Sequence, residues 1–437
     1  MRQKRLAVML KFQQLVLVGV LAACARAAGP ELAQVAQATS APAVKIVGGK
    51  WFDGRQFSER VMYMDHGVFV DRPSREPDSA IDLNGAWVVP PFAEAHNHNF
   101  DASSPAAAKA VVAKYMKDGI FYGENPANVL RARQGLEGFI NIPTGIDVTF
   151  SNAALTGPGG HPLGLFLRNL GRGVMLATDT NTTGGFIWII RDKNDLETKW
   201  PSILASKPDF IKVILAYSDQ YERRLADSTT FNWRGIDPKL VPWIVSHARE
   251  AGLRVMTHVE SAADFHNSLI AGVQIIGHTP GFRGNEQTQL PDFAPYLISD
   301  ADAELAAKQG TYVVTTLGGI VGVPDTALRH RADSLFTINL RTLKRHDVRI
   351  ILGSDSYRET DLPEALYLSS LGVFSNAELL RAWSEVTPRA IFPSRKIGKL
   401  SPGYEASFIA LDANPLADFS NVTKIQLRVK QGYTIQL

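Results

Sequence analysis

The chain has 437 residues, of which 45% are apolar and 20% are charged, so it can bury a large core and is neither disordered nor fibrous. Its formal charge is only +3, and no basic stripe or acidic run stands out, which argues against a nucleic-acid partner. Four of the positive charges lie in the first 11 residues, so a chain without that segment is close to neutral.

Residues 1–23 have the pattern of a signal peptide. Basic residues precede an apolar run at 15–23 that is too short to span a bilayer, and Cys24 follows directly. The motif "LAAC" resembles the lipobox of bacterial lipoproteins. We therefore expect lipidation at Cys24, export to the bacterial periplasm or outer membrane, and membrane contact only through that anchor. A secretory signal cut near 25–27 is the alternative.

Cys24 is the only cysteine, so no intramolecular disulfide can form. Residues 24–43 are rich in Ala, Gln and Pro and are interpreted as a flexible tether. Residues 44–89 contain short alternating segments separated by turn signals such as Asn84-Gly85, which predict β-strands. The β pattern returns over 398–437. We expect these two segments to form one small β-sandwich domain.

Between them, residues 90–397 alternate helical segments with apolar strands, which indicates a parallel sheet. Eight strands can be numbered, the first ending at "AHNH", so the predicted fold is α/β with a (β/α)₈, TIM-like barrel. A doubly wound sheet is the structural alternative. The other seven expected strands are 119–125, 145–157, 209–219, 253–260, 273–281, 311–319 and 348–356.

Ligand-type side chains fall at the carboxyl ends of these strands, where such barrels place their chemistry. Each has a structural explanation when taken alone: a lysine facing outward, a buried histidine with a partner, or an aspartate that caps a helix. Together they predict a metal site, because imidazoles one residue apart in a strand share a face. His161, in a loop, is a further candidate to reach the site. The six predicted ligands are His96, His98, Lys212, His258, His278 and Asp355.

With these residues in place, the chain resembles the amidohydrolase superfamily of metal-dependent hydrolases, in its prolidase-like and imidazolonepropionase-like branch. "GAWVVPPFAEAHNH", "DFIKVILA" and "ILGSDS" are similar to the family's first, fourth and eighth strand segments. Two positions depart from the family pattern. Pro91 replaces a usual glycine, and Thr257-His258 stands where many relatives have more histidines.

The resemblance implies two divalent metal ions, with zinc favoured by the nitrogen and oxygen ligands. It implies that His96, His98 and Asp355 hold one ion, that His258 and His278 hold the other, and that carboxylated Lys212 bridges them. A hydroxide shared by the metals would attack an amide or peptide C–N bond of a small molecule, such as a dipeptide or an N-acyl amino acid. Asp355 and His278 are the expected catalytic residues.

Three alternatives remain at this point. A mononuclear deaminase of a nitrogen heterocycle would use Glu260 near the fifth strand, although it would not need Lys212. A lactone or ester hydrolase would use the same nucleophile, and a lipid-anchored binding protein would keep the barrel without catalysis. Tyr217 is a candidate substrate-binding residue by position alone, and a homo-oligomer is expected only by analogy.

Overall fold

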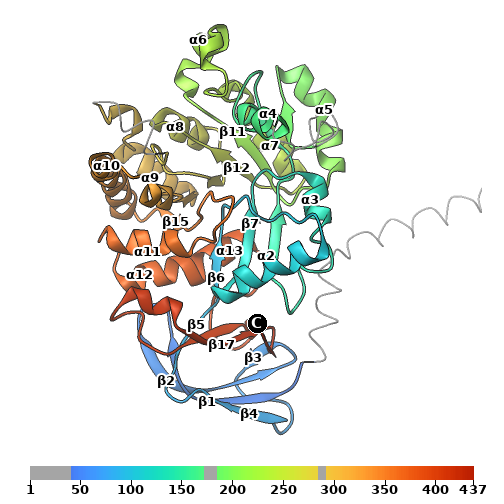
Figure 1. Cartoon of the computed structure of the whole chain (residues 1–437), viewed down its shortest axis with the longest axis vertical. Helices are drawn as coiled ribbons and strands as arrows, with labels where there is room; N and C mark the ends of the chain where they lie inside the picture. Colours follow the sequence, from blue (N-terminus) through green and yellow to red (C-terminus); the bar gives the residue numbers. More distant parts are fainter. Residues whose placement is uncertain (1–40, 172–184, 284–291) are drawn as a thin grey trace, which may run out of the picture.

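The computed structural model describes residues 41–171, 185–283 and 292–437 (Figure 1). The predicted signal peptide, Cys24 and all but the end of the predicted tether lie outside the described residues. None of the helices in the described ranges combines the length and the apolar character that crossing a bilayer requires.

The first and last strands of the described chain lie together in one mixed sheet, at the bottom of Figure 1. The sheet has eight strands in the order β18-β17-β16-β5-β1-β2-β3, with β4 paired to β1. The prediction that the two β segments meet is therefore confirmed, but they share one sheet rather than two packed sheets. The strands are β1 (Val44–Phe52), β2 (Phe57–Asp65), β3 (Val68–Val70), β4 (Ser79–Asp82), β5 (Trp87–Val89), β16 (Phe408–Leu411), β17 (Ile425–Lys430) and β18 (Tyr433–Thr434).

Apolar side chains on one face of this sheet form its core. Trp51 of β1 packs against Phe69 and Phe408, with ring centroids 6.0 and 5.6 Å apart. The turn predicted at Asn84-Gly85 is present, because both residues have positive φ angles of 50° and 82°.

The remaining strands are all parallel and form two sheets. A three-stranded sheet runs β6-β7-β8, and a seven-stranded sheet runs β10-β9-β11-β12-β13-β14-β15. These strands are β6 (Phe92–Glu94), β7 (Ile120–Asn125), β8 (Asp147–Phe150), β9 (Ala154–Thr156), β10 (Ile187–Ile189), β11 (Ile211–Ile214), β12 (Val255–His258), β13 (Ile275–Ile276), β14 (Tyr312–Val314) and β15 (Arg349–Ile351).

The parallel α/β class is confirmed, whereas one closed eight-stranded ladder is not formed by the described strands. The expected single strand 145–157 is divided into β8 and β9 by a bend at Asn152, whose φ is +55°. The segments that follow β6 and β15 are connected by individual backbone hydrogen bonds and not by a strand ladder. The Ala95 amide donates to the Leu352 carbonyl at 2.7 Å, and the Asp355 amide donates to the His96 carbonyl at 2.9 Å. These bonds bring the first and last predicted strand ends together.

Helices alternate with the parallel strands, as expected, and α8 shows why they start where they do. Ser261 and Asp264 form a capping box at its first turn. The helices are α2 (Pro105–Lys117), α3 (Leu130–Gln134), α4 (Leu163–Gly171), α5 (Lys193–Ala205), α6 (Tyr221–Ala226), α7 (Val241–Glu250), α8 (Ala262–Ile270), α9 (Asp300–Gln309), α10 (Thr326–Arg345), α11 (Leu362–Ser370), α12 (Asn376–Arg381) and α13 (Thr387–Ile391).

A buried ionic cluster connects the mixed sheet to the parallel strands. Lys430 of β17 is fully buried and donates to Asp147 of β8 at 2.7 Å and to the carbonyls of Ile142 and Gly145. Arg395 donates to the other oxygen of Asp147 at 2.8 Å. A paired lysine is tolerated at such a position, whereas an unpaired one would be very costly.

Candidate metal centre

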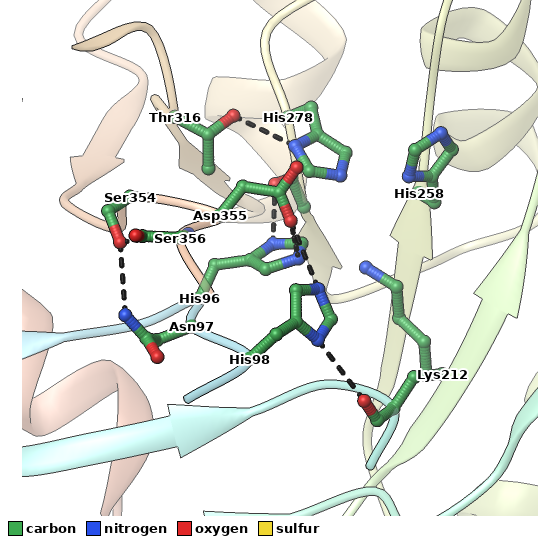
Figure 2. A network of polar contacts seen from close by, with 12 residues as sticks. His96, Asn97, His98, Lys212, His258, His278, Thr316, Ser354, Asp355 and Ser356 are labelled. Carbon is green, nitrogen blue, oxygen red and sulfur yellow. Dashed lines mark hydrogen bonds and ion pairs between the residues drawn. The ribbon is translucent and has the colours of Figure 1, made fainter. Parts of the chain in front are cut away.

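Five of the six predicted ligands lie at or just after the carboxyl ends of parallel strands, and Lys212 lies within a strand (Figure 2). His96 and His98 follow β6, Lys212 lies in β11, and His258 ends β12. His278 follows β13 and Asp355 follows β15. Parallel strands present these ends on one side of the sheet, so residues far apart in the sequence meet there.

His96, His98 and Asp355 form a group whose candidate ligand atoms all lie within 4.8 Å of one another. Nε2 of His96 and of His98 lies 3.4 and 3.0 Å from Asp355 Oδ1. The Nδ1 atoms contact the carbonyls of Gly277 and Ala127 at 2.8 and 3.1 Å. A carbonyl only accepts, so each Nδ1 carries the proton and each Nε2 of a neutral ring keeps its lone pair. Three acceptor atoms then face one point, and a cation there would stabilise them.

His278 and His258 extend this group. The ring centroid of His278 lies 4.4 Å from that of His96 and 4.5 Å from that of His258. His278 Nδ1 bonds to Thr316 Oγ1 at 2.8 Å, and its buried Nε2 has no hydrogen-bond partner among the described residues. His258 Nε2 bonds to Glu260 Oε1 at 2.9 Å, which leaves Nδ1 as its free nitrogen.

Burial, reinforced by neighbouring positive groups, lowers the pKa of His96, His258 and His278 well below the usual value for histidine. These rings are therefore neutral near pH 7 and able to bind a metal. An unsatisfied buried nitrogen is costly unless something ligates it. The donor set thus fits a metal ion.

Lys212 points from β11 toward the histidines (Figure 2). Its side chain is buried, and Nζ donates to Met256 Sδ at 3.6 Å, a weak acceptor. Burial lowers the pKa of Lys212 to about 7, with partial compensation from Asp355 and Glu124. A substantial fraction of the amine is therefore neutral, as carboxylation by carbon dioxide requires.

A cavity of ≈ 190 Å³ opens beside this group. Five of the six predicted ligands line it, whereas His278 does not and is fully buried. The cavity is lined by His96, His98, Pro126, Ala127, His161, Pro162, Leu165, Arg168, Phe186, Lys212, Ile214, Asn232, His258, Arg283, Asp355 and Tyr357.

Tyr217 is not among these lining residues. Its backbone N–H donates to Asp264 at 2.9 Å, and its ring lies 3.9 Å from the Arg224 guanidinium. These contacts of Tyr217 stabilise the loop that follows β11. Its predicted role in substrate binding gains no support from its position.

Three further residues complete the surroundings of the predicted ligands. The ring of His161, the loop candidate from the sequence, stacks on His258 with centroids 4.8 Å apart, so it does reach the site. Tyr357 stacks on His98 at 5.0 Å. Arg283 also lines the cavity, and neither it nor Tyr357 is marked by any motif in the sequence.

Comparisons with known proteins agree with this geometry. The family model described as the amidohydrolase family matches residues 87–434. A search of curated proteins found no match. Among solved structures, A. niger ochratoxinase is 19% identical with a TM-score of 0.70, covering 90% of this chain and 95% of the other.

Two further solved structures have a similar fold. A Xaa-Pro dipeptidase with bound methionine is 18% identical with a TM-score of 0.68, covering 90% of this chain and 100% of the other. Molinate hydrolase is 14% identical with a TM-score of 0.68, covering 91% and 95% of the two chains. At these identities the similarity shows a shared fold.

Proposed function

Because this chain belongs to the amidohydrolase family, we propose that it hydrolyses the amide or peptide C–N bond of a dipeptide or an N-acyl amino acid. Membership confirms the predicted enzyme class, a hydrolase acting on carbon–nitrogen bonds, and the family is metal-dependent. The observation that carries the proposal is the meeting of His96, His98 and Asp355 beside the buried amine of Lys212. Similar structures named as a dipeptidase and an ochratoxinase support a substrate of this size.

We assign the ligands as the family resemblance implies. His96, His98 and Asp355 would hold one cation, His258 and His278 a second, and the carboxylated amine of Lys212 would lie between them. A set of imidazole nitrogens combined with carboxylate-type oxygens favours zinc. When bound, such cations polarise a carbonyl and lower the pKa of water to near neutrality.

Asp355 is the proposed proton carrier. Burial raises the pKa of its carboxyl, but the close contact with His98 and nearby positive groups outweigh burial, and the pKa lies below the usual value. Asp355 is therefore ionised at neutral pH and can accept a proton from the attacking water. It would then pass this proton to the departing nitrogen, which general acid–base catalysis requires. His278 is the other predicted catalytic residue. It is fully buried, so its proposed contribution is to bind the second cation.

The deaminase alternative receives less support from the geometry. Glu260 contacts both His258 Nε2 at 2.9 Å and Arg283 Nε at 2.8 Å, and its side chain is 2% exposed. Glu260 is therefore engaged by two side chains of the site, and it is not among the residues that line the cavity. A lactone or ester remains a possible second substrate class, because the same centre would cleave it.

Export and lipidation at Cys24 belong to the same proposal, supported by the pattern of residues 1–24 alone. A small-molecule substrate reaching the cavity outside the cytoplasm would suit an enzyme held by one lipid anchor. Mass spectrometry of the protein purified from membranes tests this point. A diacylglycerol adduct on Cys24 is expected, and an intact N-terminus or cleavage near 25–27 would contradict it.

Metal analysis combined with a substrate screen tests the catalytic proposal. We expect about two metals per chain and release of an amino acid from a dipeptide or an N-acyl amino acid, with lactones and heterocyclic amines in the same screen. Lys212→Ala should lower both the metal content and the activity. One metal per chain together with an active Lys212→Ala variant and ammonia release would favour the deaminase instead. Loss of activity in Asp355→Asn would exclude a binding protein without catalysis.

A further inference from the structure

Arg283 lies at the wall of the cavity, close to the predicted metal ligands but outside their set. Its Nε donates to Glu260 Oε1 at 2.8 Å, and Glu260 in turn contacts His258. One terminal nitrogen of the guanidinium lies 3.2 Å from His161 Nε2. Arginine only donates, so His161 Nε2 is the acceptor.

The surroundings of Arg283 fix the direction of its guanidinium. The group lies 5.2 Å from the ring centroid of Phe282 and 5.8 Å from that of Trp233. Its partner Glu260 is buried and is itself anchored, because its backbone N–H donates to Asp264 at 3.0 Å. A planar donor that is held before the ligand arrives loses little freedom on binding.

Charge at the cavity wall favours an anionic ligand group. Two arginines, Arg168 and Arg283, line the cavity, and Arg283 pairs with the buried Glu260 through Nε. The carboxylate among the lining residues is Asp355, which contacts His96 and His98. The Arg283 side chain is still 26% exposed, so its guanidinium is accessible from the cavity. Arg168 is exposed at the outer part of α4, where solvent screens its charge.

From this geometry we infer that Arg283 binds the free carboxylate on the amino-acid half of the substrate and thereby selects it. The inference rests on the proposed function, since it places the scissile amide between Asp355 and Arg283. The guanidinium can donate two parallel N–H bonds, one to each oxygen of a carboxylate. A carboxamide has only one acceptor oxygen, and its NH₂ group cannot accept the second bond. The enzyme would accordingly act on chain ends bearing a carboxylate and discriminate against amidated or neutral analogues.

The test compares matched substrates with purified, metal-loaded enzyme. Each N-acetyl amino acid in a panel of apolar side chains is paired with its carboxamide, and kcat/KM is measured for both. We expect the wild type to prefer the acids by about 10- to 100-fold. Arg283→Gln should reduce this preference to within about threefold, because it lowers the rate on the acids much more than the rate on the amides. Arg168→Gln is the matched control and should keep the preference.

Three results of this comparison would overturn the inference. A wild type without acid preference across the panel overturns it, as does an Arg283→Gln variant that loses activity on acids and amides alike. Loss of the preference in Arg168→Gln but not in Arg283→Gln overturns it as well. Because Arg283→Gln removes the positive charge next to buried Glu260, the double variant Arg283→Gln/Glu260→Gln provides a second test of the ratio.

Equilibrium binding separates this inference from the proposed function. The same acid and amide pairs are titrated calorimetrically into chelator-treated protein, where hydrolysis is absent. Tighter binding of the acids that depends on Arg283 supports the inference even if no pair is hydrolysed by the metal-loaded enzyme, an outcome in which the proposed function alone fails. Equal binding of acids and amides to the wild type overturns the inference while leaving hydrolysis to be judged separately.

Discussion

Gly277 lies directly against the amine of Lys212. A Cβ on Gly277 would lie 2.9 Å from Lys212 Nζ, 3.2 Å from His96 Cε1 and 2.8 Å from the Thr257 carbonyl. The same glycine accepts the hydrogen bond from His96 Nδ1 through its own carbonyl. One residue without a side chain therefore provides both the space around the lysine amine and the orientation of a predicted ligand.

Gly277→Ala should consequently impair the metal site without a large loss of fold. The added methyl group would occupy the space that a carboxylated Lys212 needs, and a contact under 3 Å with backbone forces a shift. We expect metal content to fall from about two ions per chain and activity to fall at least tenfold, measured by elemental analysis and kinetics. Gly319→Ala, where nothing lies within 4 Å of the new Cβ, is the control and should resemble the wild type. An unchanged metal content in Gly277→Ala would contradict this account.

Candidate ligands could be identified in the sequence because they contrast with their surroundings. Strands covered on both faces are apolar, so Lys212 within "FIKVIL" and histidines at strand ends stand out. Residues on loops lack such a background. Arg283 and Tyr357 reach the cavity only because the chain turns after His278 and Asp355, and no periodicity encodes that turn. Tyr217 is a candidate by position alone, and it is not among the residues that line the cavity.

The fold was predicted at the level of element type and order. Helical and strand segments alternate as the sequence indicates, but strand pairing depends on local bends that periodicity does not reveal. Asn152 adopts a φ of +55° between β8 and β9, where a single strand was expected. β10 extends the sheet beyond the eight predicted strands, because three apolar residues at 187–189 pair with β9.

Asp355→Asn tests the proton carrier. An amide cannot accept the proton of the attacking water, so kcat should fall by about 10²- to 10⁴-fold. In the wild type the lowered pKa of Asp355 keeps its carboxylate down to acidic pH, and the activity that depends on it is lost as pH falls through that pKa. Steady-state kinetics and metal analysis of the variant are required together. A variant with full metal content and more than a tenth of the wild-type kcat would exclude this role.

Glu124→Gln should change how stability depends on pH. Glu124 is fully buried, and neither carboxylate oxygen has a hydrogen-bond partner among the described residues. Burial raises its pKa from 4.5 to about 8, with smaller opposing effects of Arg254 and Lys212. Between these values the folded chain binds a proton that the unfolded chain releases, so stability falls as pH rises across the window.

Glutamine has the same shape and no charge, so the variant should lose this part of the slope. At the upper end of the window, near pH 8, Glu124→Gln should be more stable than the wild type by about 1–4 kcal/mol, and near the lower end the two should be similar. Denaturant unfolding of chelator-treated protein measures the difference, with Glu137→Gln as the exposed control. If the free energies of unfolding of the wild type and Glu124→Gln changed with pH in parallel, Glu124 would be ionised in the folded chain and the prediction would be wrong.

Lys430→Met tests the connection between the mixed sheet and the parallel strands. Methionine fills a similar volume but removes the donor to Asp147 and leaves the carbonyls of Ile142 and Gly145 unpaired in the interior. Arg395 still contacts Asp147 at 2.8 Å, so the buried carboxylate keeps one partner. We expect a loss of about 3–5 kcal/mol in the free energy of unfolding. Lys424→Met, at an exposed position shortly before it, should change stability by less than about 0.5 kcal/mol.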